Sequence, residues 1–300
     1  MKSGAKIAVI VLAAMAVLVA GLLPAAAAPS AEEWASWKRA FLQDDGRVID
    51  TGNGGISHSE GQAYGMMLAA EMNDRVAFAR IWGFADRVLR LNDDPLMAWR
   101  YDPRRRPAIA DPNNASDGDM MAAYALVEAY RAWGDRAHLD AAREIARALS
   151  DASIVSWRDR EVLLPARSGF GAADRPDGPV VNLSYYVFET LETLETLAPG
   201  RGWAEMDGQG RAMIAGVLGA GRLPADWLSL PRALAPAEGF EPTFGYNNLR
   251  LPVYLARGGM APETRMMMAR LAERMGDAEG RLLIRDTISG AVRERLTEPG

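Results

Sequence analysis

The sequence predicts an all-α protein whose helices follow one another as hairpins. Apolar residues recur at three- and four-residue steps through most of the chain, which is the pattern of amphipathic and buried helices. Gly, Pro and Asp separate these segments, as turn residues do. One stretch has strand character, residues 152–166, in which Asp159 and Arg160 can turn a small β-hairpin. The segments predicted to be helical are 31–42, 61–72, 75–91, 119–133, 138–149, 184–197, 203–218, 248–259 and 263–276.

The helical segments are expected to close into a ring of roughly six hairpins, given the usual lengths of helices and loops. Several segments are nearly all apolar, for example residues 120–127, and such helices are buried on every side. An inner layer of apolar helices, screened by an outer layer of amphipathic ones, satisfies this pattern. No long linker or break in composition divides the chain, so residues 28–300 are predicted to form one domain.

Residues 1–27 have the pattern of a secretory signal peptide. Lys2 and Lys6 precede an apolar run over residues 7–24, and small residues then allow cleavage after Ala27. The alternative is an uncleaved membrane anchor, because the apolar run is close to the length that spans a bilayer. The sequence therefore predicts an exported protein, either periplasmic or secreted.

The composition excludes several classes of protein. The chain has 34 Lys and Arg against 39 Asp and Glu, and removal of Lys2 and Lys6 would leave 32 against 39, a net charge of −7. An acidic protein binds nucleic acid poorly, so no such partner is expected. With no cysteine and two histidines, His58 and His138, the chain has little material for a metal site or a Ser-His-Asp triad. We expect neither a metal nor a cofactor.

Two apolar helical segments open with acidic residues. Glu60 precedes the segment 61–72, and Asp117 and Asp119 precede residues 120–133. One interpretation is helix capping, with Ser57 or Ser59 accepting a backbone N–H and the acid interacting with the helix dipole. The other is catalytic, because Glu60 and Asp117 would face one opening if the two helices were neighbours in an inner ring.

Paired carboxylates in a cleft are what glycoside hydrolysis requires. One protonated acid serves the leaving oxygen, and one ionised group activates water. The apolar residues after Glu60 are expected to raise the pKa of its carboxyl, and the polar loop before Asp117 to keep that residue ionised. Aromatic residues in loops and at helix entries, Trp99, Tyr101, Tyr185 and Tyr246, can bind the apolar faces of pyranose rings, with core packing as the alternative for each.

The segments ISHSEGQAYGMML (56–68) and NNASDGDMMAAYALVEAYRAW (113–133) resemble the two best-marked segments of glycoside hydrolase family 8. Residues 45–55, 182–186, 245–255 and 286–296 look like further family segments in the same order. The resemblance implies an (α/α)6 barrel and an inverting mechanism on β-1,4-linked glucans, xylans or chitosan. It implies that Glu60 is the proton donor, and that Asp117 is the signature acid, which acts as a nucleophile or positions the sugar.

The chain departs from the family pattern where a general base is usual. Many members have Y-D-A-I-R at the segment that reads Tyr246-Asn247-Asn248-Leu249-Arg250 here. An amide cannot take a proton from water at working pH, so Asn247 cannot be that base. The nearest replacements are Asp117, which we favour, and Glu241.

The leading hypothesis is an exported endo-β-1,4-glucanase acting on cellulose-type β-glucan, similar to endoglucanases encoded beside bacterial cellulose synthases. The alternatives are a chitosanase of the same family and a glycan-binding relative with catalysis weakened by Asn247. Mixed acidic and Arg residues in the loop 91–118 favour a neutral polysaccharide over cationic chitosan. We expect a monomer, with a functional link to a cellulose synthase complex as a further hypothesis. Its catalytic residues would be Glu60 and Asp117, and its substrate-binding residues Trp99, Tyr101, Tyr185, Tyr246, Asn247 and Arg250.

Overall fold

The computed structural model describes residues 29–296, so the predicted signal peptide, residues 1–27, lies outside the described residues. Within the described part no helix is long and apolar enough to cross a membrane. The nine α-helices of that part are α2 (Ala31–Phe41), α3 (Ser59–Glu71), α4 (Arg75–Phe84), α5 (Ser116–Trp133), α6 (Arg136–Ser153), α7 (Leu191–Leu197), α8 (Trp203–Gly219), α9 (Leu251–Arg257) and α10 (Pro262–Met275). A π-helix, η2 (Ala85–Leu89), continues α4, and three 3-10 helices follow, η3 (Leu183–Tyr185), η4 (Phe188–Thr190) and η5 (Asn248–Arg250).

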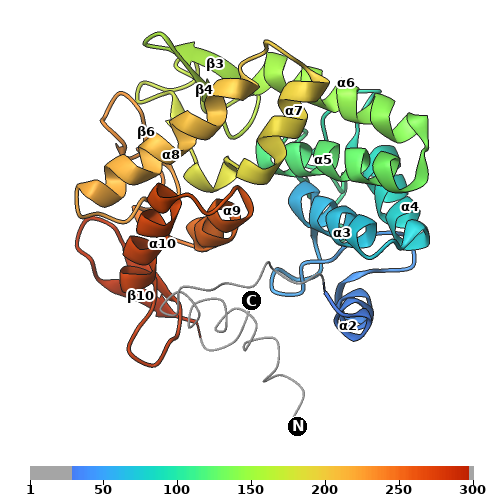
Figure 1. Ribbon diagram of the computed structural model, residues 1–300, viewed down its shortest axis with the longest axis horizontal. Helices are drawn as coiled ribbons and strands as arrows, with labels where there is room; N and C mark the ends of the chain where they lie inside the picture. Colours follow the sequence, from blue (N-terminus) through green and yellow to red (C-terminus); the bar gives the residue numbers. More distant parts are fainter. Residues whose placement is uncertain (1–28, 297–300) are drawn as a thin grey trace.

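The helices are arranged as a ring in two layers. Figure 1 shows α3, α5 and α9 toward the middle, with α4, α6 and α10 outside them. Burial agrees with this placement, because most of α5 is buried, whereas α6 buries only one side. The loop between these two helices turns at Gly134, whose φ of 74° favours glycine, and Asp135 caps α6 by accepting a hydrogen bond from the Ala137 N–H. The predicted inner and outer layers are therefore present.

Four small antiparallel sheets join the helices within residues 29–296, and the sequence predicted one of them. Strands β3 (Ile154–Trp157) and β4 (Arg160–Leu163) form a hairpin in which Trp157 pairs with Arg160. Its turn is Arg158-Asp159, one residue earlier than expected, and both residues have the positive φ that a two-residue hairpin turn requires. The other sheets consist of β1 (Ser57–His58) with β2 (Arg100–Tyr101), β5 (Val180–Val181) with β6 (Leu228–Ser229) and β7 (Ala235–Pro236), and β8 (Thr243–Phe244) with β9 (Leu283–Asp286) and β10 (Val292–Arg295).

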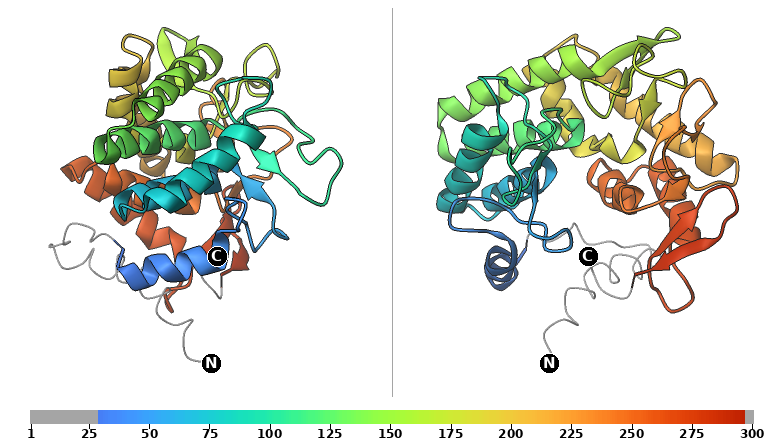
Figure 2. Two further views of the ribbon diagram at one scale, coloured as in Figure 1. Left: turned by 90° about the vertical axis from the view of Figure 1, so that its right-hand side faces the viewer. Right: turned by 180° about the vertical axis from the view of Figure 1, so that it is seen from behind.

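The strands β1 and β2 and the long loop that precedes α5 lie on one side of the helix ring, as the left view of Figure 2 shows. Strand β1 leads directly into α3, and β2 lies within the connection from η2 to α5. Loops on one face of a rigid scaffold are where functional sites are usually built. The N-termini of α3 and α5 therefore lie on the side of the helix ring that carries these loops.

Candidate active site

Glu60 is the second residue of α3, and it does not take part in a helix cap. The N-cap residue is His58, in extended conformation, and no side chain accepts a hydrogen bond there. The hydroxyls of Ser57 and Ser59 are buried and lack a hydrogen-bond partner in the described part of the chain. The capping interpretation is therefore wrong for these serines. The Glu60 carboxylate forms an ion pair with the guanidinium of Arg250 instead, so its surroundings are not simply apolar as expected.

Asp117 is the second residue of α5, and its side chain is more buried than the polar loop before it suggested. Its side chain is 1% exposed, and its Oδ1 accepts a hydrogen bond from the Gly118 N–H at 2.8 Å. Burial raises the pKa of Asp117 to about 7, and the hydrogen bond opposes that shift. We expected the polar loop to keep this carboxyl ionised. That expectation is wrong, because burial disfavours the charged form.

Gly118 allows the N-termini of α3 and α5 to come together. A Cβ atom at this position would lie 2.5 Å from the Ser59 Oγ and 2.8 Å from the Glu60 backbone nitrogen. Real Cβ atoms do not approach other atoms so closely, so any larger residue would force the two helices apart. Because Glu60 and Asp117 flank this contact, the glycine sets the distance between the two acids.

Arg250 brings the two predicted acids to one charged group. It lies at the end of η5, and its Nη1 donates a hydrogen bond to Asp117 Oδ2 at 3.2 Å and contacts Glu60 Oε1. Its Nη2 donates to Asn247 Oδ1 at 2.8 Å and to Ser184 Oγ at 3.1 Å. Burial lowers the pKa of Arg250, but the guanidinium stays protonated at any working pH. Of the predicted residues, Glu60, Asp117, Asn247 and Arg250 thus form one network.

Asn247 is joined on its other side to a carboxylate that the sequence did not single out. Its Nδ2 donates to Asp226 Oδ2 at 3.3 Å, and Asp226 Oδ1 accepts from the backbone N–H groups of Gly245 and Asn248. Asp226 is 8% exposed, and burial raises the pKa of its carboxyl. Glu241, the other acid considered as a base, is exposed, and its carboxylate makes no hydrogen bond within residues 29–296.

A second polar contact links α3 to the η5–α9 segment, one helical turn beyond Glu60 and Arg250. Tyr64 follows Glu60 by one turn of α3, and Tyr254 follows Arg250 by one turn of the η5–α9 segment. The two phenol hydroxyls are in hydrogen-bond contact, and burial raises the pKa of both tyrosines. This polar contact therefore holds α3 and α9 together, next to the ion pair of Glu60 with Arg250.

Trp99 is held against the start of α3, at the residue that precedes Glu60. The Ser59 N–H donates to the Trp99 carbonyl at 3.0 Å, and the indole stacks on the His58 ring at 6.0 Å and 3°. The indole N–H also donates to Asp111 Oδ2 at 2.9 Å. The loop that carries Trp99 is anchored by the buried Asp119, whose Oδ1 accepts from the Met97 N–H at 3.0 Å.

The other predicted aromatic residues are placed differently from one another. Tyr185 lies 5.9 Å from the Arg250 guanidinium and therefore belongs to the network. Tyr101 packs edge-on against Phe84 at 5.4 Å, which is a contact with the core. Tyr246 is 59% exposed, and its hydroxyl donates to Glu294 Oε1 on β10 at 2.9 Å. The described contacts of Tyr101 and Tyr246 do not join them to the two acids.

A cluster of aromatic residues that the sequence did not predict continues from Tyr185. The Trp227 ring meets Tyr185 edge-on at 6.1 Å and stacks with Phe170 at 5.2 Å and with Phe240 at 4.9 Å, and these two phenylalanines lie 6.3 Å from each other. These residues lie singly in irregular segments, where no periodic pattern marks them. Their proximity in space, and not their spacing in sequence, identifies them.

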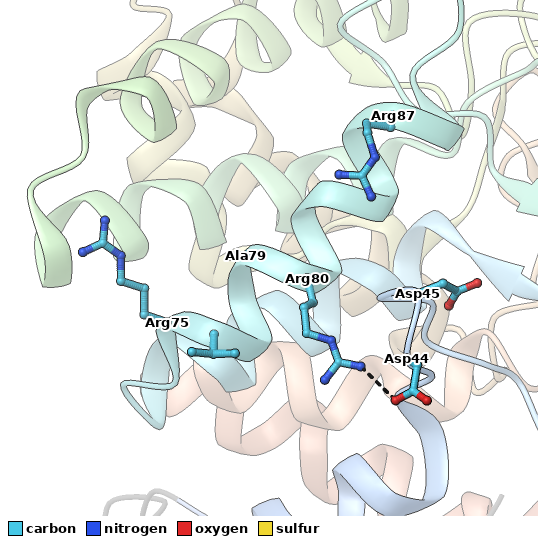
Figure 3. A pocket seen from close by; sticks show the side chains of 7 residues that line it. Asp44, Asp45, Arg75, Ala79, Arg80 and Arg87 are labelled. Atoms are coloured by element: carbon cyan, nitrogen blue, oxygen red, sulfur yellow. Dashed lines mark ion pairs between the residues drawn. The ribbon is translucent and has the colours of Figure 1, made fainter.

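The outer face of α4 has a groove of about 640 Å³ that contains none of the predicted site residues. Figure 3 shows Arg80 directed toward Asp44, with which it forms an ion pair at 3.5 Å, while Arg75 and Arg87 point elsewhere. Within residues 29–296 there is also no group of three or more His, Asp or Glu side chains that could hold a metal ion. The strongest candidate for an active site is the Arg250 network, because it joins Glu60, Asp117 and Asn247 to one guanidinium.

The two acids of this network lie close to each other. Nη1 of Arg250 contacts an oxygen of each acid, at 3.2 Å for Asp117 and more closely for Glu60. Those two oxygens are therefore less than 6.4 Å apart, which is twice the longer distance. Two carboxylates at such a separation, beside Trp99 and Tyr185, can act on the same glycosidic bond.

Comparison with known proteins identifies the family of this chain. The family model for glycosyl hydrolases family 8 matches residues 7–280. An endoglucanase of Cellulomonas uda is 36% identical over 240 residues, which cover 78% of this chain and 65% of the relative. A probable endoglucanase of Novacetimonas hansenii is 37% identical over 228 residues, covering 75% and 66%. The chain thus spans about two thirds of the length of these curated relatives.

Solved structures give the same result. The endo-beta-1,4-glucanase CMCax of Acetobacter xylinum is 34% identical with a TM-score of 0.77, over 87% of this chain and 82% of that one. The family 8 endoglucanase Cel10 of Klebsiella pneumoniae is 31% identical with a TM-score of 0.77, over 86% and 83%. The family model covers most of the chain, and the structures share its helix-rich fold. The chain belongs to glycosyl hydrolases family 8.

Proposed function

We propose that the protein is an endo-β-1,4-glucanase that hydrolyses cellulose-type β-glucan. The observation that carries the proposal is the meeting of Glu60 and Asp117, from neighbouring helix N-termini, at the guanidinium of Arg250. Trp99 and Tyr185 supply aromatic faces beside these groups. The substrate class is taken from the relatives of Cellulomonas uda and Acetobacter xylinum, which are described as endoglucanases.

In the proposed reaction Glu60 donates a proton to the glycosidic oxygen while the bond from that oxygen to the anomeric carbon breaks. A water molecule attacks the anomeric carbon from the opposite face and gives its proton to Asp117, so the configuration inverts. An inverting pair needs roughly 6.5–9.5 Å between its carboxyl groups to leave room for that water. In the structure both acids contact Arg250 Nη1, so in this reaction the glycan displaces the Glu60 carboxyl from Arg250 as it enters.

The alternative role for Asp117 is to bind a sugar hydroxyl and position the ring. Azide distinguishes the two roles, because a small anion can replace a missing base. If Asp117 is the base, the Asp117→Ala variant regains turnover with azide and forms an inverted glycosyl azide. If Asp117 positions the sugar, azide restores nothing. Glu241→Ala is the matched control at an exposed acid, and rescue confined to that variant would assign the base to Glu241.

The activity is tested on carboxymethyl cellulose, barley β-glucan, xylan and chitosan, by measuring new reducing ends and viscosity together. An endo-acting glucanase lowers the viscosity of the first two polymers well before many reducing ends accumulate. Proton NMR of the first product should show the α-anomer. Hydrolysis confined to chitosan would identify a chitosanase instead. Binding to β-glucan without hydrolysis would identify the glycan-binding relative and overturn the enzymatic proposal.

We further propose that the helix ring is an (α/α)6 barrel, with the β3–β4 hairpin as an insertion, and that residues 28–300 form its single domain. The basic start, the apolar run and the small residues before Pro29 support export to the periplasm or beyond. N-terminal sequencing of protein recovered from the periplasm should begin at Ala28. We also propose a monomer, which light scattering can test, and a functional link to a cellulose synthase, which co-purification can test.

A further inference from the structure

Asp226 is a buried carboxylate that the proposed mechanism does not use. It precedes β6, and its backbone N–H donates to the Thr243 carbonyl at 2.8 Å, which ties it to β8. Its Oδ1 accepts from the Gly245 N–H at 2.9 Å and from the Asn248 N–H at 3.3 Å, where η5 begins. A Cβ atom at position 245 would lie 2.4 Å from Asp226 Oδ2, so this turn is closed around the carboxylate.

The two neighbours of Asn247 determine which way its amide points. The carboxylate of Asp226 can only accept hydrogen bonds, and the guanidinium of Arg250 can only donate them. Nδ2 of Asn247 therefore faces Asp226 at 3.3 Å, and Oδ1 faces Arg250 Nη2 at 2.8 Å. An amide satisfies both neighbours at once because it carries one donor group and one acceptor group.

We propose that Asp226 is a positioning residue that orients the Asn247 amide and thereby holds Arg250 between Glu60 and Asp117. Asp226 touches neither acid directly, so its effect passes through the amide. An aspartate at position 247 would instead place its carboxylate against that of Asp226. The kinetic consequence of this inference depends on the proposed glucanase activity, whereas the placement of Arg250 does not.

The first experiment exchanges the two groups. In Asp226→Asn the new amide offers an N–H₂ to Asn247, which must turn its oxygen toward it and present its own N–H₂ to Arg250. We expect kcat to fall about 30-fold, because Arg250 loses a hydrogen-bond acceptor. In Asp226→Asn with Asn247→Asp, the exchanged pair again presents an oxygen to Arg250, and kcat should recover at least about tenfold over the single variant. Asn247→Asp alone controls for a new base at position 247: its carboxylate faces that of Asp226, so its kcat should stay below that of the wild type, whereas a new base would raise it.

The matched control is Asp286→Asn. Asp286 is 7% exposed and accepts the backbone N–H groups of Ile288 and Ser289, but it has no contact with Arg250 in the described chain. It should lower the melting temperature without changing kcat. A folded Asp226→Asn variant with wild-type kcat would overturn the inference, and so would an exchanged pair that folds but recovers nothing.

A second measurement is independent of catalysis. Arg250 is 19% exposed in its side chain, and its reaction with 4-hydroxyphenylglyoxal can be followed by mass spectrometry of the peptide that contains it. Asp226→Asn should increase the modification rate severalfold, and the exchanged pair and Asp286→Asn should not. An unchanged rate in Asp226→Asn overturns the inference even if the protein is a glucanase. A wild-type protein without glucanase activity removes the proposed function but leaves this measurement valid.

Discussion

The two sides of the Arg250 network are built in different ways. On one side, Glu60 and Asp117 sit in the first turns of α3 and α5, which are long helices packed closely at Gly118. On the other side, Asn247 and Arg250 belong to a turn and a short 3-10 helix, held in shape by the Asp226 carboxylate. The helical side fixes the acids through backbone packing, whereas the loop side fixes its cation through side-chain hydrogen bonds. Substitutions on the two sides should therefore fail in different ways.

The largest effect is expected for Glu60→Gln, on the helical side. Glutamine keeps the shape of the side chain but cannot donate the proton that the leaving oxygen needs, so kcat on β-glucan should fall at least about a hundredfold. Circular dichroism and the melting temperature should remain near those of the wild type. Normal turnover of an unactivated polymer by this variant would remove Glu60 from its role.

On the loop side, Arg250→Lys should lower kcat/KM by roughly ten- to a hundredfold. Lysine keeps the charge but loses the planar fork, so it cannot bind Asn247, Ser184 and the two acids at the same time. Steady-state kinetics on barley β-glucan measures this loss. Arg257→Lys is the control, since Arg257 pairs with Glu189 and has no contact with the two acids. Equal losses in both variants would mean that general stability, not the network, is responsible.

Gly118→Ala tests the helical side by packing alone. Its Cβ would meet the Ser59 hydroxyl and the Glu60 backbone, which cannot yield easily, so the free energy of unfolding should fall by about 1–3 kcal/mol. Urea unfolding measures this change. Gly134→Ala is a poor control, because its positive φ adds strain, whereas Gly216→Ala in α8 meets no neighbouring atom and should be neutral or stabilising. A Gly118→Ala variant as stable as the wild type would mean that α3 and α5 can separate without cost.

The burial of Asp117 gives a pH test. Its pKa rises from 3.8 in the unfolded chain to about 7 in the fold, so the folded state binds the proton more tightly. This group's contribution to the free energy of unfolding is therefore present below about pH 4 and is lost as pH rises to about 7. The free energy of unfolding, measured with urea, should fall between pH 4.5 and 7.5. Asp117→Asn should make this fall smaller by on the order of 2 kcal/mol.

The control for the pH test is Asp286, whose pKa is shifted in the opposite direction. The pKa of Asp286 is lowered by hydrogen bonds from the backbone of Ser289 and from Arg293, so its contribution is lost only in stronger acid. Asp286→Asn should leave the slope between pH 4.5 and 7.5 unchanged. If Asp117→Asn also left the slope unchanged, Asp117 would be ionised throughout this range, and Arg250 would be the cause.

The difference between the two sides also explains what could be predicted from sequence. Helix starts with acids before apolar residues are visible as local patterns, which is why Glu60 and Asp117 were found together. Their surroundings were not predictable, because the partner of Glu60 lies 190 residues away in the chain. The serine caps were wrong because the chain around them is held by backbone contacts, with Ser57 in β1 and the Ser59 N–H bonded to the Trp99 carbonyl.

Asp226 had no local signal. It stands just before β6 in the sequence PADWLSL, and its role is fixed by a turn that begins 19 residues further on and wraps around it. The short sheets escaped prediction in a similar way, since strands of two residues, such as β1 and β2, cannot display an alternating pattern. The strand pair matters nevertheless, because it joins the loop that carries Trp99 to the start of α3, where the Ser59 N–H donates to the Trp99 carbonyl.

The smallest effects are expected for two aromatic residues, Trp99 and Tyr246. Trp99 lies at the helical side of the network, whereas Tyr246 lies outside the network. Trp99 stacks on His58 beside Glu60, so Trp99→Ala should raise KM for β-glucan about tenfold, the value of roughly 1.4 kcal/mol of lost sugar contact. Tyr246 is 59% exposed and binds Glu294, so Tyr246→Ala should raise KM less than about threefold. Both variants should keep kcat within about threefold, because neither ring exchanges a proton with the substrate. A large fall in melting temperature with unchanged KM would identify Trp99 as a packing residue, and a larger KM effect at Tyr246 than at Trp99 would place the glycan along β10 instead of beside β2.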